Sequence, residues 1–355
     1  MTANIYGMVV RPPVGEPVAP SFPGSFVYVI RDDATYVARE LRKRLSLSGP
    51  DDAAENTIGR AYESFLEKLF ELFLNAAAWR GPLEVHVYAS DEIERAREER
   101  IAEAHRVVSL DPLCEAAHAI HLGLSRWYHP GGSDLAREGF RPGFPDVADQ
   151  LARLRRTVGS APVTLIEDDM YTGETLASTV AELRASGINV KQVVVGIKIC
   201  QTDLAIPGVD TAAAVRYKLD TERPLSEQID LGDPRDYLIG LSGLVILLEK
   251  ESAEGPILGR APYLLPFVKP SDRASFPSDF DWELSLAVLK LSQDFYQRLS
   301  RDLGLTIRIK HCDPHFALMA AHELGVTEED AMTDFIENIL SDAPRLATHL
   351  MRGRR

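Results

Sequence analysis

Two adjacent carboxylates, Glu167 and Asp168, follow the apolar run 163–166, and a turn containing threonine and glycine comes shortly after them. Carboxylates at the end of a buried strand accept hydrogen bonds from hydroxyl groups or bind a divalent cation. The turn 169–175 opens into a run with helical spacing, so its backbone N–H groups and hydroxyls suit a phosphate. Gly173 lets the backbone approach phosphate oxygens without a Cβ. A sugar phosphate would suit both parts of this segment, with its hydroxyls at the acid pair and its phosphate at the turn.

The elements around this segment alternate between short β-branched runs and stretches with helical periodicity, which predicts a doubly wound parallel sheet covered by helices on both faces. In such an α/β fold, ligands bind beyond the carboxyl ends of the strands, where the acid pair lies. The expected strands are 83–89, 106–110, 124–128, 162–167, 190–199, 212–219 and 237–248. The expected helices between them are 90–104, 111–123, 145–157 and 174–186.

The two ends of the chain differ from the middle in composition and in the periodicity of their apolar residues. Residues 11–24 hold five prolines and two glycines, which predicts an arm that is extended or turning rather than helical. Helical spacing follows at 34–44 and 53–79, and after a Pro- and Gly-rich passage at 255–277 it returns at 281–301 and 314–351. The sequence therefore predicts three regions, namely an arm with a helical region (1–81), an α/β core (82–250) and a C-terminal helical region (251–355).

The stretch IEDDMYTGETL resembles the phosphoribosyl pyrophosphate (PRPP) signature of type I phosphoribosyltransferases, with Glu167 and Asp168 as its acidic pair and no gap in the register. The resemblance covers roughly residues 105–200 and implies a phosphoribosyltransferase-like fold. It implies that Glu167 and Asp168 hold the ribose 2- and 3-hydroxyls. It also implies 5-phosphate contacts from the turn, through the backbone of Asp169, Tyr171 and Glu174 and through Thr172, Gly173 and Thr175.

Other landmarks of that family fit less closely. Hypoxanthine-guanine enzymes carry an aspartate where this chain has Tyr171, which argues against purine salvage by that route. The expected pyrophosphate loop, 111–114, lacks glycine and arginine, and its Asp111 opposes an anion unless Mg²⁺ intervenes. Arg126 and the loop 127–134 could supply cations for pyrophosphate, although a surface turn is an equal alternative. Lys198 is expected near the base, or simply exposed at a strand end.

These features predict a Mg²⁺-dependent transferase that moves a phosphoribosyl group from PRPP, or another phosphorylated ribose, to a nucleobase or other small-molecule acceptor. In this interpretation Glu167, Asp168 and Arg126 serve the reaction, and the two acids could also contact Mg²⁺. The alternative is a non-catalytic PRPP or nucleotide sensor that uses the same pocket. A PRPP synthetase is less favoured because no ATP-binding segment is recognisable upstream of the signature.

Two further clusters have the residue types of zinc sites. Cys114, His118 and His121 would share one face of the expected helix 111–123. The other cluster consists of His311, Cys312, Asp313 and His315. Neither has the paired short spacings of a zinc finger, so buried or half-buried structural positions are favoured. Cys114 as a nucleophile has no recognisable partner order and is favoured still less.

The composition narrows the class of protein. With 39 Lys and Arg against 53 Asp and Glu, the net charge of −14 argues against a nucleic-acid binder. The first 21 residues lack an apolar signal core, and the longest apolar run, 237–248, is too short to span a bilayer. Together with three widely spaced cysteines, this predicts a cytoplasmic protein without membrane contact. The Leu/Phe stripe at 65–74 suits the core or a subunit contact, and the latter would make a homo-oligomer.

Overall fold

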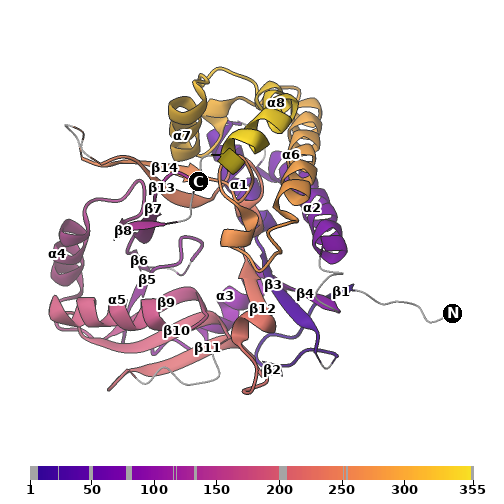
Figure 1. Ribbon diagram of the computed structural model, residues 1–355. Coiled ribbons are helices and arrows are strands. Elements are labelled where there is room, and N and C mark those ends of the chain that lie inside the picture. Colours follow the sequence, from indigo (N-terminus) through magenta and orange to yellow (C-terminus); the bar gives the residue numbers. More distant parts are fainter. Residues whose placement is uncertain are drawn as a thin grey trace.

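The computed structural model describes residues 7–22, 24–47, 51–76, 82–114, 116, 118–131, 134–199, 206–250, 252 and 255–352. The chain is an α/β protein with three sheets, and every strand pair in two of them, sheets A and B, is parallel (Figure 1). The α/β class with parallel sheets is thereby confirmed. The specific phosphoribosyltransferase-like topology and the three-region division stay predictions.

Sheet B holds the acid pair. In spatial order its strands are β2 (Pro17–Val18), β11 (Asp210–Tyr217), β10 (Val190–Lys198), β9 (Val163–Met170), β5 (Arg106–Ser109) and β6 (Ile120–His121). The helices α4 (Val147–Val158) and α5 (Glu174–Ala185) contribute apolar side chains to the cluster on one face of the sheet. From β5 the chain adds β6 on one side and β9 to β11 on the other, so the strand order reverses between β5 and β9.

Sheet A lies next to sheet B. Its strands, in order, are β1 (Gly7–Val10), β4 (Leu83–Ala89), β3 (Phe26–Asp32) and β12 (Ile229–Gly232). The helix α3 (Ser90–Glu98) packs between the two sheets, because its Ile93 and Ala96 share one buried cluster with Val29 of sheet A and Ile197 of sheet B. This packing brings the carboxyl ends of β3 and β9 together.

A third, mixed sheet covers the carboxyl edge of sheet B. Its strands, in order, are β14 (Ile257–Ala261), β13 (Leu244–Glu249), β7 (Leu124–Tyr128) and β8 (Leu135–Phe140). The strands β7 and β8 pair antiparallel, and the buried Trp127 at their centre stacks edge to face on Phe140. Gly139 allows this packing, since a Cβ there would lie 2.6 Å from the indole ring. The hairpin therefore presents Arg126 and Glu138 at fixed positions beside the site.

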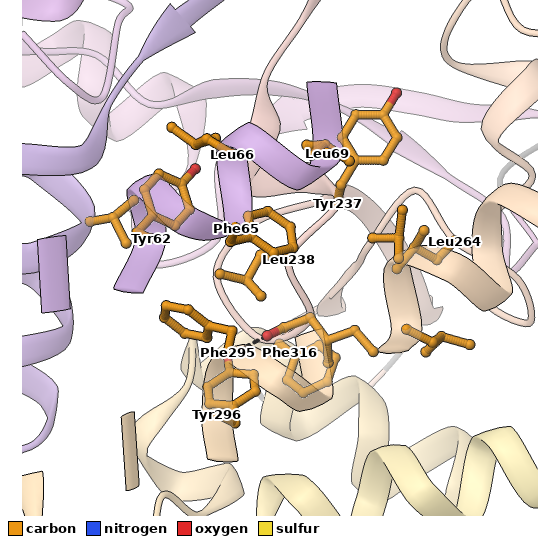
Figure 2. Packing of buried hydrophobic residues seen from close by; sticks show 14 of the residues in the cluster. Tyr62, Phe65, Leu66, Leu69, Tyr237, Leu238, Leu264, Phe295, Tyr296 and Phe316 are labelled. Carbon is orange, nitrogen blue, oxygen red and sulfur yellow. Dashed lines mark hydrogen bonds between the residues drawn. The ribbon is translucent and has the colours of Figure 1, made fainter. Parts of the chain in front are cut away.

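Helices from both ends of the chain share one large core. They are α1 (Ala34–Arg44), α2 (Asp51–Ala76), α6 (Asp281–Leu303), α7 (Pro314–Leu324) and α8 (Met332–Arg352). In Figure 2, Tyr62 and Phe65 of α2 face Phe295 of α6, and Leu238 lies between them and Phe316 of α7. The 65–74 stripe is thus largely core. None of the described helices is long and apolar enough to cross a membrane.

Several expected elements are wrong in detail. The segment 111–123 is not a helix, since its described residues form turns and the short β6. The run 237–248 is not one strand, because β13 begins only at Leu244. The N-terminal region contains β3 besides its helices, the passage 255–277 contains β14, and 314–351 is divided into α7 and α8. For β3, β6 and β14 pairing with other strands outweighed the local pattern, whereas α7 ends at Gly325, which adopts φ +67°.

The buried Glu84 of β4 fixes Ser21, Phe22 and Ser25 to sheet A. Its carboxylate accepts hydrogen bonds from the N–H groups of Ser21 (2.8 and 2.9 Å) and Phe22 (3.2 Å), from the Ser25 hydroxyl and from His86 (Nε2 to Oε2, 3.0 Å). Burial alone would raise the pKa of Glu84, but the hydrogen bonds from Ser25 and Ser21 lower it to about 2.

We expect Glu84→Gln to lower the free energy of unfolding by about 2 kcal/mol at neutral pH, because charge-assisted hydrogen bonds are lost. The folded-state pKa lies below the unfolded one, so this stabilisation is present above the unfolded pKa and disappears as the pH falls towards 2. Urea unfolding of both proteins between about pH 6 and pH 3 measures the difference. A constant difference across this range would contradict the assignment.

Candidate functional site

The acid pair lies at the point where the strand order of sheet B reverses. Strands β5 and β9 pair in parallel with Ser109 opposite Ile166, so Asp111 and Glu167 leave the sheet at the same edge. Clefts at such switch points are the usual ligand sites of open α/β sheets. Gly196 of β10 lets the backbone of Asp168 pack closely against β10. A Cβ at this position would lie 2.5 Å from the backbone oxygen of Asp168.

The turn after β9 has the conformation expected of a phosphate cradle. Gly173 adopts φ +84° immediately before α5, which begins at Glu174. The Thr172 hydroxyl accepts a hydrogen bond from the Glu174 N–H at 3.4 Å. Arg126 reaches across from β7 and donates through Nη2 to the Thr175 hydroxyl at 2.5 Å. The turn thus combines the N–H groups of a helix start with one guanidinium, a pairing that favours an anion.

A cavity of about 750 Å³ opens above this edge of the sheet. Glu167, Asp168 and Thr175 line it from sheet B and α5, and Arg126 lines it from β7. Its remaining walls come from α1, the β8 strand, residues 233–245, β14 and Asp313. The volume lies within the range of small-molecule sites, roughly 300–1,000 Å³. Glu167, Asp168 and Thr175 therefore face a space large enough for a sugar phosphate and a second small molecule, whereas Thr172, Gly173 and Glu174 line neither this cavity nor the smaller one on the other side of Asp168.

A smaller cavity of about 290 Å³ lies on the other side of Asp168. Asp168 lines both cavities, whereas Asp169 lines only the smaller one. The sheet A side contributes Arg31 of β3, whose Nη2 lies 3.9 Å from Oδ2 of Asp168. The carboxyl ends of the two parallel sheets thus meet at Asp168, whose side chain is 38% exposed.

Two of the three consecutive acids of β9 lie where their surroundings oppose ionisation. Burial, followed by repulsion from Asp168, raises the pKa of Glu167 well above its ordinary value. The same two causes raise the pKa of Asp169, against a smaller opposing effect of Arg31. Partly buried carboxylates in this condition gain from a cation or from hydroxyl donors.

Beneath the acids, Asp111 forms a buried ionic network. It accepts two hydrogen bonds from Arg31 (3.0 and 3.3 Å) and one from Arg97 of α3 (2.8 Å). Arg97 also donates to the backbone oxygen of Glu167 at 3.0 Å. Burial opposes ionisation of Asp111, but the two arginines hold its pKa well below the ordinary range. The acid of the expected pyrophosphate loop is therefore neutralised from within the protein.

Tyr171 was expected at the phosphate only through its backbone, and its side chain points away from the site, whereas Lys198 was expected near the base. The Tyr171 ring packs in the cluster between the sheets, and its hydroxyl donates to the backbone oxygen of Ile229 at 3.5 Å. Lys198 is buried at the end of β10 and lines neither cavity, so it is not an exposed strand-end lysine. Arg126 contacts Thr175 of the phosphate turn, whereas the sequence pattern had assigned it to the pyrophosphate.

The two cysteine and histidine clusters are not arranged as zinc sites in the described residues. Among the described residues no group of three or more His, Cys, Asp or Glu side chains is placed to hold a metal. Cys114 is not on a helix, and Asp313 is the N-cap of α7. Mg²⁺ is commonly bound by one or two carboxylates together with substrate oxygens, and Glu167 and Asp168, which line the same cavity, are ligands of that type.

Most of the cations around the cavity were not predictable from the sequence. Arg44, Arg141, Arg235 and Arg260 line it, and Arg31 lies beside it. They come from α1, the end of β8, residues after β12, β14 and β3, which are widely separated in the sequence. Among these five arginines, only Arg31 had a local sequence signal for a position at a sheet edge, because it follows the β-branched run 26–30.

Fold and site together define an α/β protein of parallel sheets with an acidic pair and a helix start facing a cavity at the switch point. Comparison of the chain with protein-family models, curated proteins and solved structures found no match. A functional conclusion consequently depends on the sequence motif and on the geometry of this cavity.

Proposed function

We propose that the protein binds PRPP and, with Mg²⁺, transfers its phosphoribosyl group to a small-molecule acceptor. The observation that carries the proposal is the common cavity of Glu167, Asp168 and Thr175, with the signature turn in the conformation of a helix start. The ribose diol of PRPP would donate hydrogen bonds to the two acids, and its 5-phosphate would bind at the turn and Arg126. The proposal includes a cytoplasmic location, because three widely spaced cysteines are typical of reduced thiols rather than of a disulfide framework.

In the proposed reaction a nucleophile of the acceptor bonds to the anomeric carbon while the bond from that carbon to pyrophosphate breaks. Glu167 and Asp168 orient the ribose through its hydroxyls, and the exposed carboxylate of Asp168 stabilises the oxocarbenium character of the transition state. Thr175 and the first N–H groups of α5 hold the 5-phosphate, with Arg126 opposite its charge. The protein thereby positions the partners and stabilises charge.

When bound, Mg²⁺ would neutralise the leaving pyrophosphate. Glu167 and Asp168 are the residues that would hold it. Arg31 is the protein cation closest to Asp168 on the sheet A side, and we assign it to the pyrophosphate end of the ligand.

A second candidate, a PRPP or nucleotide sensor without turnover, is favoured by one specific observation. The loop 111–114 offers no glycine or arginine, and Asp111 already occupies Arg31 with two hydrogen bonds. A protein that only binds the ligand has no need to release pyrophosphate from this loop. The two candidates make the same prediction for binding and opposite ones for turnover.

Calorimetric titration with PRPP and Mg²⁺, with ribose 5-phosphate and AMP as controls, tests the site. We expect PRPP to bind and to raise the melting temperature by mass action. A pyrophosphate-release screen over nucleobases and small amines follows. Release identifies the transferase, and binding without release identifies the sensor. If none of the three ligands binds, the proposed function is wrong.

A further inference from the structure

Three arginines from separate elements converge on the large cavity outside the signature turn. Arg44 ends α1, Arg141 follows β8 directly and Arg260 lies in β14. Within the described ranges, Asp313 is the one carboxylate that pairs with Arg44 and Arg260, at 3.4 Å (Nη2 to Oδ2) and 3.8 Å (Nε to Oδ1). Direct ion pairs thus oppose these guanidiniums with one carboxylate, while Asp236 lies within electrostatic range of Arg260 and the acid pair within range of Arg141.

Asp313 cannot satisfy both arginines. Its Oδ1 already accepts the N–H groups of His315 (2.9 Å) and Phe316 (3.3 Å) as the N-cap of α7. Nη1 of Arg44 and Nε of Arg260 are buried without a hydrogen-bond partner. Such unsatisfied donors are rare in folded proteins and call for an explanation, such as a bound ligand. An anion in the cavity would supply acceptors for these donors.

Arg141 connects this cluster to the acid pair. In the part of the chain that the structure describes, no hydrogen bond or ion pair reaches its guanidinium. It lies within electrostatic range of Glu167, Asp168 and Arg260. Burial lowers its pKa, and the attraction of Glu167 does not reverse this effect. A group bound by the three arginines would therefore adjoin the ribose that the two acids are proposed to hold.

The surface next to the arginines suits a carbon skeleton. Tyr36, Val37 and Arg44 lie on one face of α1 and line the cavity together, and Leu241 lies among the other lining residues. The Tyr36 ring also has the Arg235 guanidinium 5.2 Å from its centroid. Apolar and aromatic surface beside cations favours an organic anion over pyrophosphate, which has no apolar part.

We propose that Arg44, Arg141 and Arg260 form an anion subsite that holds the carboxylate or phosphate group of the acceptor. This inference rests on the proposed phosphoribosyl transfer and narrows it, because neutral nucleobases would leave the three arginines without an anion. The acceptor is then a small organic anion whose nucleophilic atom lies between this subsite and Glu167 and Asp168.

Simple probes test the subsite in the full-length protein. The protein is saturated with ribose 5-phosphate, which occupies the turn and the acids, and is then titrated with benzoate, phenyl phosphate, benzamide and pyrophosphate. We expect benzoate or phenyl phosphate to bind and the uncharged benzamide not to bind. We expect Arg260→Met and, as a second variant, Arg44→Met to weaken that binding at least about tenfold, the equivalent of about 1.4 kcal/mol.

Arg298→Met is the matched control, because Arg298 lies on α6 outside the cavity and pairs with Asp302 at the surface. It should leave anion binding unchanged, and all variants should bind ribose 5-phosphate within about twofold of the parent protein, less than the tenfold loss expected for the anion. The proposal is overturned if benzoate and benzamide bind equally, if no organic anion binds, or if both arginine variants bind normally.

Two outcomes separate this inference from the proposed function. If pyrophosphate alone binds and loses affinity in the arginine variants, the subsite holds the leaving group and the acceptor assignment is wrong. If organic anions bind through the arginines but neither ribose 5-phosphate nor PRPP binds, phosphoribosyl transfer is wrong and only an anion subsite is supported.

Discussion

The Asp168→Asn variant is expected to bind PRPP about 10- to 100-fold more weakly than the parent protein, because hydrogen bonds from a diol to a carboxylate contribute about 1.5–3 kcal/mol. Asp168 is the best acid for this test, since it lines both cavities and its side chain is 38% exposed. The substitution keeps the shape of the side chain, so the fold should persist. Titration calorimetry of both proteins with PRPP and Mg²⁺ measures the difference.

Asp210→Asn provides a matched control at the opposite end of the same sheet. Asp210 is the exposed first residue of β11, so the substitution removes one negative charge from the amino edge of sheet B. We expect PRPP affinity to stay unchanged in this variant, which separates a local contact from a general effect of net charge. A folded Asp168→Asn protein with normal PRPP affinity would remove Asp168 from the site.

The fold was predictable where local pattern and tertiary environment agree. The run 163–166 is buried on both faces of a parallel sheet, and its β-branched and apolar residues indicated the strand that became β9. The helices at 34–44 and 281–301 have strong apolar periodicity, and α1 and α6 follow them closely. The helix expected at 111–123 failed because Asp111 is held by Arg31 and Arg97, and because β6 pairs with β5. Neither interaction is visible in a local pattern.

The site was predictable only as far as it is contiguous in sequence. The acids and the turn occupy one stretch of β9 and α5, so their types and spacing alone indicated a ribose-phosphate pocket. The arginines around the cavity come from elements that only tertiary packing assembles. Arg44 and Arg260, for example, share the carboxylate of Asp313, and no short spacing in the chain signals this arrangement.

The largest loss of stability is expected for Arg97→Met. The Arg97 side chain is 1% exposed, and the Asp111 carboxylate with which it pairs is fully buried. Removing one partner of a buried ion pair typically costs about 3–5 kcal/mol, because a charge stays in the interior without its compensation. Arg31 would keep two of the hydrogen bonds to Asp111, but the one from Arg97 to the Glu167 backbone would also be lost. Urea denaturation at neutral pH measures the change.

Arg95→Met on the same helix is the control, because Arg95 and Asp91 form an exposed i,i+4 pair with side chains 67% and 75% accessible. Such a pair contributes about 0.3–0.5 kcal/mol, so its loss should be barely measurable. A similarly small change for Arg97→Met would mean that Arg31 alone compensates Asp111. In that case Arg31 would be committed to Asp111, and its assignment to the pyrophosphate would lose support. The stability of one buried network thus bears directly on the choice between transferase and sensor.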